Sequence, residues 1–203
     1  MKEFSMRKGR FSKNSDGLSF RRRRKKVDKK KVSKVFLYLA EIVVIAALAF
    51  LTSYSFFTGL KMHGQSMEKG IEDNDTLLLN KAIYHFRSPK RGDVIAFYPS
   101  GNRNSYPSIK RVMGVPGDTI KIEAGYLYIN GQEYKGTPKI SGIKDPGILD
   151  AGVTLGNDEY FVLGDNTNAS EDSRFTKIGM ISKADILGVI WWDATFPRFG
   201  MVS

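Results

Sequence analysis

The sequence predicts a mostly β protein, with a single N-terminal transmembrane helix followed by an antiparallel β domain. Three observations predict this fold class: an uninterrupted apolar run at residues 35–57, a basic segment before it, and a series of short β-branched and aromatic runs after it. A chain of 203 residues is long enough for one well-buried domain with appendages. We therefore expect a basic tail at 1–34, a transmembrane anchor at 35–57 and a folded domain at 58–203.

The positive charge of the chain is concentrated in the tail. The formal net charge is +11, and 15 of the 32 Lys and Arg residues lie within residues 1–34. The remainder of the chain is close to neutral, which argues against a nucleic-acid partner. The tail has few apolar residues, so we expect it to be disordered by itself.

The apolar run has the length and composition of a membrane span. Its 23 residues contain one charged side chain, Glu41, and as a helix they would extend about 34 Å, enough for a bilayer core of about 30 Å. The basic flank predicts a single-pass protein of the cell membrane, with the tail in the cytoplasm and the folded domain outside. The segment Ala47-Leu48-Ala49 is typical of cleavable signal peptides, but the run continues to Phe57, which favours an uncleaved anchor in contact with lipid.

The folded domain contains short segments typical of strands. Asn130-Gly131 predicts a hairpin turn, the Gly- and Pro-rich segment 134–158 predicts a loop with a short helix as the alternative, and a helical turn is expected around 181–187. The chain has no cysteine, which excludes disulfides and a cysteine nucleophile, and its two histidines leave little material for a metal site. We expect neither a metal nor another cofactor. The predicted strands lie at 76–84, 92–99, 108–115, 119–131, 159–165 and 188–192.

A serine nucleophile close to the membrane is suggested by Ser66, which lies nine residues beyond the apolar run in the segment GQSMEKG. A serine hydroxyl becomes a good nucleophile only when a neighbouring base takes its proton. His63 and His85 are candidate bases, but nothing in their sequence surroundings favours either, and both fit loop or surface positions.

Lys110, in the segment SIKRVMGVPGD, is the other candidate base. In a strand it would share a face with Ser108 and Val112, whereas Ile109 and Arg111 would point to the opposite face. A strand lysine is usually a solvated edge residue. To act as a base it must be largely neutral, so apolar burial would have to lower its pKa from about 10.4 to about 7 or 8.

Four segments resemble conserved boxes of bacterial type I signal peptidases: GQSM at 64–67, PKRGDVIAF at 89–97, IKRVMGVPGD at 109–118 and GDNTNASEDSR at 164–174. They occur in this order behind the predicted anchor, and the resemblance covers about residues 35–195. It implies a membrane-bound serine endopeptidase with a Ser/Lys dyad that removes signal peptides from exported preproteins. These signal peptides would carry small residues at −1 and −3. The resemblance assigns Ser66 as nucleophile and Lys110 as general base, and the short interval between Lys110 and Ser170 implies the small accessory β insertion of Gram-positive members, here at about 119–158.

The resemblance also implies supporting roles for other residues. The backbone N–H of Ser66 would stabilise the oxyanion, Ser170 would orient Lys110, and Met67 would shape the site. Gly64 occupies a position at which some members supply a hydroxyl group. Asp165, Asp172 and Arg174 would brace the site through charged and hydrogen-bonded contacts.

The chain also departs from the family pattern. Lys69 and Gly70 replace a proline and a following Ser or Thr, and Thr167 replaces an arginine. Ser66 and Lys110 are both present, so we expect an active peptidase. Because of the departures, we expect its substrate range to be narrower or its reaction slower. One alternative is a non-catalytic chaperone or scaffold for surface pilus assembly, with secretion or pilus-assembly machinery as partner. The other is a self-cleaving regulator, which would carry a soluble DNA-binding head instead of an anchor.

The RGD tripeptide at 91–93 fits a structural turn better than an adhesion motif.

Overall fold

The computed structural model describes residues 29–202, so the predicted disorder of the tail falls outside the described residues for 1–28, and it is wrong for residues 29–34, which are helical. The chain divides within its first helix, between Ala46 and Ala47, into two units. The first unit contains the N-terminal part of that helix, and the second contains its C-terminal part and all of the strands.

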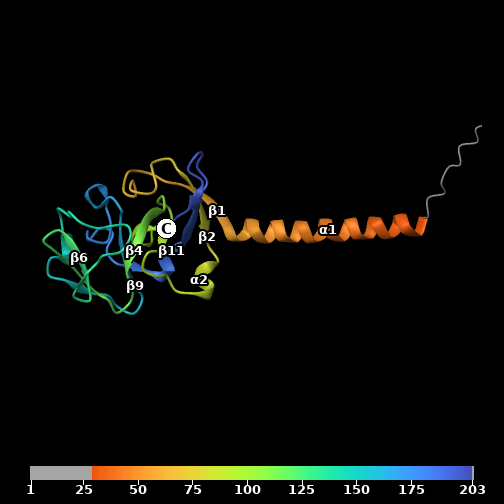
Figure 1. Cartoon of the computed structure of the whole chain (residues 1–203). Coiled ribbons are helices and arrows are strands. Elements are labelled where there is room, and N and C mark those ends of the chain that lie inside the picture. Colours follow the sequence, from red (N-terminus) through yellow and green to blue (C-terminus); the bar gives the residue numbers. More distant parts are fainter. Residues whose placement is uncertain (1–28, 203) are drawn as a thin grey trace, which may run out of the picture. The chain divides into compact units, whose positions relative to one another are not determined.

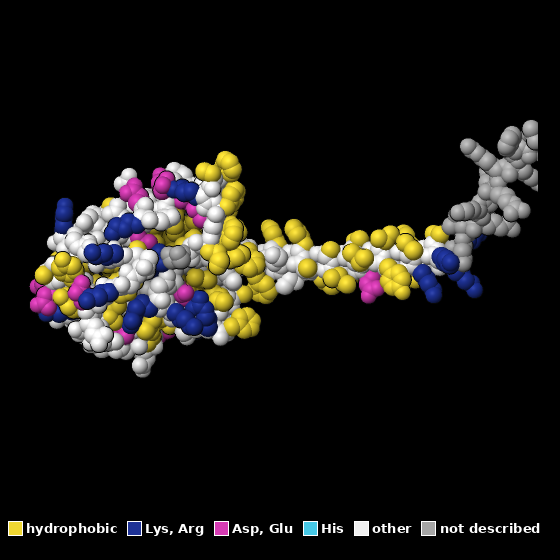
Figure 2. Space-filling view, viewed as in Figure 1, with side chains coloured by type: hydrophobic (Ala, Val, Ile, Leu, Met, Phe, Trp, Pro, Cys, Tyr) yellow, Lys and Arg dark blue, Asp and Glu magenta, His cyan; other side chains and the backbone are white. Residues whose placement is uncertain are grey.

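The first helix, α1 (Lys29–Phe56), is long and apolar enough to cross a membrane. It includes residues 29–34, ahead of the predicted span, where lysine is a good helix former. The large apolar side chains from Val35 to Tyr54 are exposed to solvent in the absence of lipid. Figure 2 shows hydrophobic side chains along α1 and basic side chains near its N-terminal end. This helix therefore fits the predicted membrane anchor.

The main sheet has the strand order β1-β2-β11-β3-β4-β9-β10, with β12 paired to β11 (Figure 1). Neighbouring strands in this sheet are antiparallel. The prediction of a mostly β, antiparallel domain is thus confirmed. The strands are β1 (Phe57–Lys61), β2 (Thr76–Asn80), β3 (Val94–Phe97), β4 (Ser108–Gly114), β9 (Glu159–Leu163), β10 (Ile181–Ser182), β11 (Ile186–Asp193) and β12 (Gly200–Met201).

A second, smaller antiparallel sheet has the order β7-β6-β5-β8. Its strands are β5 (Thr119–Glu123), β6 (Tyr126–Ile129), β7 (Gln132–Glu133) and β8 (Val153–Thr154). The short helices of the described chain are α2 (Ile83–Phe86) and the 3-10 turns Pro99–Gly101, Gly147–Leu149, Thr167–Ala169 and Lys183–Asp185.

Strand β4 contributes buried side chains to three separate hydrophobic clusters. Ile109 packs with Met67 and the β2 leucines, Val112 packs with Ile95 and the residues of β9, and Met113 packs against the second sheet. Because β4 is also paired on both sides, with β3 and β9, it is held in place from several directions. The strand that carries Lys110 is therefore a rigid element of the domain.

Several predicted boundaries were wrong. The segment 76–84 does not continue as a strand, because the Asn80 side chain accepts hydrogen bonds from the backbone of Ala82 and Ile83 and starts α2. The segment 119–131 is two strands, separated by a tight turn at Ala124-Gly125. The Asn130-Gly131 hairpin is confirmed between β6 and β7.

The remaining boundaries differ less. The segment 134–158, predicted as a loop with a short helix as the alternative, is mostly loop with the 3-10 turn Gly147–Leu149, and it also contains the unpredicted strand β8. The expected helical turn around 181–187 is limited to Lys183–Asp185, and the last long strand begins at 186 instead of 188.

Candidate active site

Lys110 lies at a point where one edge of β4 loses its neighbour. Strand β9 pairs with β4 from Arg111, opposite Leu163, but the chain turns away at Gly164. Lys110 is only 7% exposed, and its Nζ lies 2.8 Å from Oγ of Ser66 and 3.3 Å from the carbonyl oxygen of Ile109. The structure thus brings together the two residues that the sequence predicts as base and nucleophile.

The surroundings of Lys110 favour its neutral form. Burial lowers the pKa of Lys110 because the ammonium loses its hydration, while the nearby carboxylates of Asp172 and Glu171 partly oppose this effect. A neutral amine can accept the proton of a hydroxyl group within hydrogen-bond distance. The pair therefore has the geometry for proton transfer from Ser66 to Lys110, and the lowered pKa of Lys110 makes its neutral, proton-accepting form more available.

The loop that carries Ser66 is fixed by buried and hydrogen-bonded neighbours. Met67 is fully buried, and its carbonyl oxygen accepts hydrogen bonds from the N–H groups of Gly70 and Ile71 at 3.0 and 2.9 Å. The carbonyl oxygen of Ser66 accepts a 3.0 Å bond from the N–H of Asn166. Within residues 29–202 the N–H of Ser66 has no acceptor, so it is free to bind a ligand oxygen.

Gly64 precedes Ser66 in a conformation that suits glycine. Its φ is +82°, in the left-handed region, and its N–H donates to a carboxylate oxygen of Asp73 at 2.8 Å. A hydroxyl-bearing residue at this position would be strained whatever space surrounds it, which is consistent with the glycine found here.

Ser170 lies against the nucleophile loop but makes no hydrogen bond to Lys110. Its Oγ is buried and has no partner within the described residues. A Cβ added at Gly164 would lie 2.4 Å from this Oγ and 2.5 Å from the carbonyl oxygen of Ser66. The absence of a side chain at Gly164 therefore allows Ser170 and Ser66 to approach each other.

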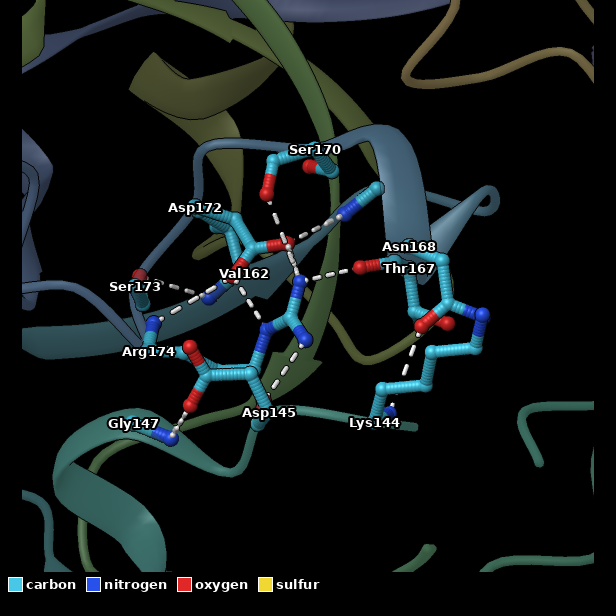
Figure 3. Close-up of polar contacts among 11 residues, drawn as sticks. Lys144, Asp145, Gly147, Val162, Thr167, Asn168, Ser170, Asp172, Ser173 and Arg174 are labelled. Atoms are coloured by element: carbon cyan, nitrogen blue, oxygen red, sulfur yellow. Dashed lines mark hydrogen bonds and ion pairs between the residues drawn. The ribbon is translucent and has the colours of Figure 1, made fainter. Parts of the chain in front are cut away.

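Arg174 organises the polypeptide around Ser170 (Figure 3). It is 1% exposed, and its guanidinium donates from Nε and Nη2 to the carboxylate of Asp172 at 2.8 and 3.0 Å. The same group donates to the backbone carbonyls of Asp145, Thr167 and Ser170. A buried charge with this many partners is stabilised, and it holds the turn that carries Ser170.

Asp165 has a partner that the sequence did not reveal. Its carboxylate accepts two hydrogen bonds from Arg111, at 2.9 and 2.8 Å, and both side chains are almost fully buried. Arg111 also donates to the carbonyl oxygen of Gly92 at 2.9 Å. A signal was present, because an arginine in the middle of an apolar strand requires a buried counter-charge. The identity of this counter-charge was not evident, since Asp165 is far away from Arg111 in the sequence.

The RGD tripeptide is structural, as predicted. The carboxylate of Asp93 accepts hydrogen bonds from Arg87, from the Tyr84 hydroxyl and from the N–H of Lys90, and Arg91 pairs with Asp118. These contacts leave the Asp93 side chain mostly enclosed within its own turn.

The histidines occupy surface positions, as expected. His63 is exposed and packs edge-on against Tyr106, with ring centroids 5.5 Å apart, while His85 is exposed on α2. His63 and Tyr106 also line a groove of about 180 Å³ between β1 and the start of β4. The other residues of this groove are Gly59, Leu60, Lys61, Pro107 and Ile109.

Comparison with known proteins identifies the family. The family model described as signal peptidase, peptidase S26, matches residues 35–192. The chain belongs to this family. Signal peptidase I P of Bacillus subtilis subsp. natto is 35% identical over 173 residues, covering 81% of this chain and 90% of that protein. Signal peptidase I U of Bacillus subtilis strain 168 is 36% identical over 168 residues, covering 79% and 87%.

A crystal structure of a signal peptidase I from Enterococcus faecalis V583 shares 32% identity and covers 51% of this chain and 97% of that chain, with a TM-score of 0.40. The chain spans 87–91% of the length of three curated relatives that are named as signal peptidase I. This chain is therefore a signal peptidase I, which removes signal peptides.

Proposed function

We propose that this signal peptidase is a membrane-bound serine endopeptidase in which Ser66 is the nucleophile and Lys110 the general base. The observation that carries the proposal is the 2.8 Å contact between Lys110 Nζ and Ser66 Oγ in a buried setting. The neutral amine takes the hydroxyl proton as Oγ attacks the carbonyl carbon of the scissile peptide bond. The resulting ammonium then protonates the leaving amine, and an acyl-enzyme remains.

Deacylation uses the same residues. Lys110, neutral again after protonating the leaving amine, removes a proton from water, the water oxygen attacks the ester carbonyl, and Ser66 recovers its proton. In both steps the free N–H of Ser66 stabilises the negative charge that develops on the carbonyl oxygen. No cofactor is needed for this sequence of proton transfers.

The supporting residues act through position. We assign to the Ser170 hydroxyl, which is buried and without a partner within the described residues, the role of orienting Lys110 when substrate is bound. Asp165, Asp172 and Arg174 hold the turns on either side of Ser170 through the buried ion pairs described above. Met67 and Gly64 fix the conformation of the loop on the two sides of Ser66.

The substrates are preprotein signal peptides with small residues at −1 and −3. The uncovered edge of β4 before Arg111 and the adjacent groove support binding of an extended peptide as an added strand. Alternate side chains of a strand point to the same face, so −1 and −3 would enter the enzyme together.

We further propose the arrangement of the chain in the cell. Residues 1–34 form a cytoplasmic tail, residues 35–57 a single-pass anchor in membrane lipid, and residues 58–203 an extracytoplasmic peptidase domain with the small β insertion at about 119–158. The basic residues before the apolar helix support this orientation. Such a protein works beside the secretion machinery, and the intact Ser66–Lys110 pair argues against the alternative of a non-catalytic scaffold for pilus assembly.

The proposal is tested by incubating detergent-solubilised protein with a preprotein and determining the new N-terminus by mass analysis. Ser66→Ala and Lys110→Met should each lower cleavage by about 1,000-fold or more, because each residue performs a step that the other cannot perform. Lys121→Ala is the matched control, since it removes an exposed lysine of the second sheet. Undiminished cleavage by either site variant would refute the dyad.

A further inference from the structure

We propose that Arg198 is a positioning residue that holds the loop carrying Ser66 in its reactive place. The inference rests on the proposed role of Ser66. The loop from Gly64 to Asp75 contains two glycines and no proline, so its own sequence does little to restrict its backbone. Its position must therefore be maintained by contacts with other segments.

Met67 and Ile71 pack in the core, but the part of the loop at Gly70 and Ile71 also borders a hollow. Gly70 and Ile71 line a cavity of about 240 Å³, whose other walls include Arg111 and Asp193 from the sheet and Arg198 with residues 200–202 from the C-terminal segment. A cavity provides no packing on that side, so the loop can shift there at small energetic cost. On this side, contacts across the cavity rim therefore add to the core packing of Met67 and Ile71 in holding the loop.

Arg198 makes those contacts. Its guanidinium pairs with the carboxylates of Glu72 and Asp75, at the end of the loop. Asp75 is 1% exposed, and its other carboxylate oxygen accepts the N–H of Glu72 at 2.7 Å. A surface ion pair contributes little, but a buried carboxylate depends on its partner, so the contact with Asp75 is the stronger one.

The end of the loop is joined to its beginning, close to Ser66. The N–H of Met62 donates to the carbonyl oxygen of Asp75 at 2.9 Å. The N–H of Asn74 donates to the carbonyl oxygen of Met62 at 3.0 Å. Asp73 accepts the N–H of Gly64 at 2.8 Å. A shift of residues 72–75 is therefore transmitted to Gly64, two residues before the nucleophile.

The C-terminal segment is a firm support for this clamp. Strand β12 pairs with β11 at Trp192 and Asp193, and the N–H of Ala194 donates to the carbonyl oxygen of Thr76 at 2.8 Å. The Thr195 hydroxyl accepts the N–H of Thr76, also at 2.8 Å. Arg198 thus connects a segment paired to the sheet with a loop that is not itself part of the sheet.

The loop also carries an excess of negative charge. Glu68, Glu72, Asp73 and Asp75 are opposed within it only by Lys69. Without Arg198, the carboxylates of Glu72 and Asp75 would face each other with one of them buried, and we expect residues 72–75 to move apart. Arg198 contacts none of the reacting atoms, so its effect is on the geometry of Ser66 relative to Lys110.

The first test measures kinetics on a preprotein with the full-length chain. Arg198→Ala should lower kcat about 10- to 100-fold with KM nearly unchanged, because misplacement of the nucleophile affects the chemical step. Arg198→Lys, which retains the charge, should recover part of the loss, and Glu72→Gln should cause a smaller loss of the same kind. Lys121→Ala, which breaks an exposed ion pair of the second sheet, should behave as the parent.

The second test does not depend on catalysis. Amide hydrogen exchange is compared between Ser66→Ala and Ser66→Ala/Arg198→Ala, and protection should be lost in residues 62–75 and retained in β4 and β9. Failure of the dyad proposal would leave this result unaffected, so the two ideas are separated. The clamp is overturned by an unchanged kcat in Arg198→Ala and Glu72→Gln, or by exchange that increases equally throughout the domain. If Arg198→Ala does not fold, Arg198→Lys and Glu72→Gln decide by the same measurements, since Glu72 is mostly exposed.

Discussion

Lys110 is buried beside two carboxylates, and these features act on its pKa in opposite directions. Burial lowers the pKa, and the carboxylates of Asp172 and Glu171 raise it. Only the neutral amine can accept the Ser66 proton, so kcat/KM should rise with pH through the pKa of Lys110, below the ordinary value of about 10.4. The position of this ascending limb is therefore a measure of the electrostatic surroundings of Lys110.

Removing one of the two carboxylates near Lys110 should change the pH at which activity rises. Glu171→Gln should move the ascending limb to lower pH, because the neutral side chain no longer stabilises the ammonium form. Glu171 is exposed, so the fold should be unaffected. The limb should stay in place in His63→Ala. A limb that is lost in His63→Ala, or one that moves to higher pH in Glu171→Gln, would contradict a lysine base in this environment.

Gly164→Ala should impair the site through close contact. The new methyl group would lie 2.4 Å from Ser170 Oγ and 2.5 Å from the carbonyl oxygen of Ser66, so one of these segments must move. We expect about 100-fold lower kcat/KM and about 1–3 kcal/mol lower stability, measured by peptide cleavage and urea unfolding. Gly200→Ala is the control, because its nearest neighbour would be 3.8 Å away. Parent-like activity of Gly164→Ala would show that the approach of Ser170 to Ser66 is not required.

The sequence offered Ser66 and Lys110 as candidates, and the resemblance to type I signal peptidases implied that they form a pair. It did not reveal that Arg111 pairs with Asp165, or that Arg198 reaches Asp75. Strand alternation says which face a side chain occupies, but a partner 54 or 123 residues away depends on tertiary structure. Long-range ion pairs are thus the part of the site that local patterns leave undetermined.

The two hairpin turns of the second sheet show what local sequence does and does not reveal. At Asn130-Gly131 both φ values are positive, 52° and 77°, and Asn-Gly is the preferred pair for such a turn. At Ala124-Gly125 the values are 51° and 80°, but alanine is rare in this conformation, so the turn between β5 and β6 was not predicted. Cross-strand pairing of Ile120 with Ile129 and Ile122 with Leu127 compensates for the strained residue.

Ala124→Asn should therefore stabilise the domain. Asparagine tolerates a positive φ better than alanine, and we expect a gain of about 0.5–1 kcal/mol, or a rise in Tm of about 1–4 °C in calorimetry. Activity should be unchanged, because the turn belongs to the second sheet. Asn130→Ala should lower the Tm, since Asn130 also bonds the N–H of Thr119 and the carboxylate of Asp118 at 2.8 Å. A lower Tm for Ala124→Asn would disprove strain at this turn.

The division into an apolar helix and a β domain follows from hydropathy and strand patterns, which are local properties of the chain. The order of strands in the main sheet is not local, because β11 is inserted between β2 and β3 and therefore pairs with segments about 100 residues earlier. Register in such a sheet is set by the buried face and the cross-strand neighbours, which no single segment determines. The sequence consequently predicted the elements and class of the fold more fully than their pairing.

The proposed anchor brings enzyme and substrate into the same membrane, and its removal tests that role. Because β1 begins at Phe57 and pairs with β2 along its whole length, a truncated chain should start before Phe57 to keep the edge of the sheet intact. A chain lacking residues 1–54 should cleave a short soluble peptide with kcat/KM within about twofold of the parent. On a preprotein held in lipid vesicles its kcat/KM should fall about 100-fold, since tethering supplies a high effective concentration.

A chain starting at Met62 is the matched comparison, because it also lacks β1, whose removal uncovers Leu77 and Leu79 of β2. It should lose activity on both substrates and unfold at a lower temperature. Equal losses on the soluble peptide and the vesicle-bound preprotein for the chain lacking residues 1–54 would mean that α1 supports the fold of the peptidase domain. Loss confined to the vesicle-bound substrate would establish that the helix acts by locating the active site at the membrane.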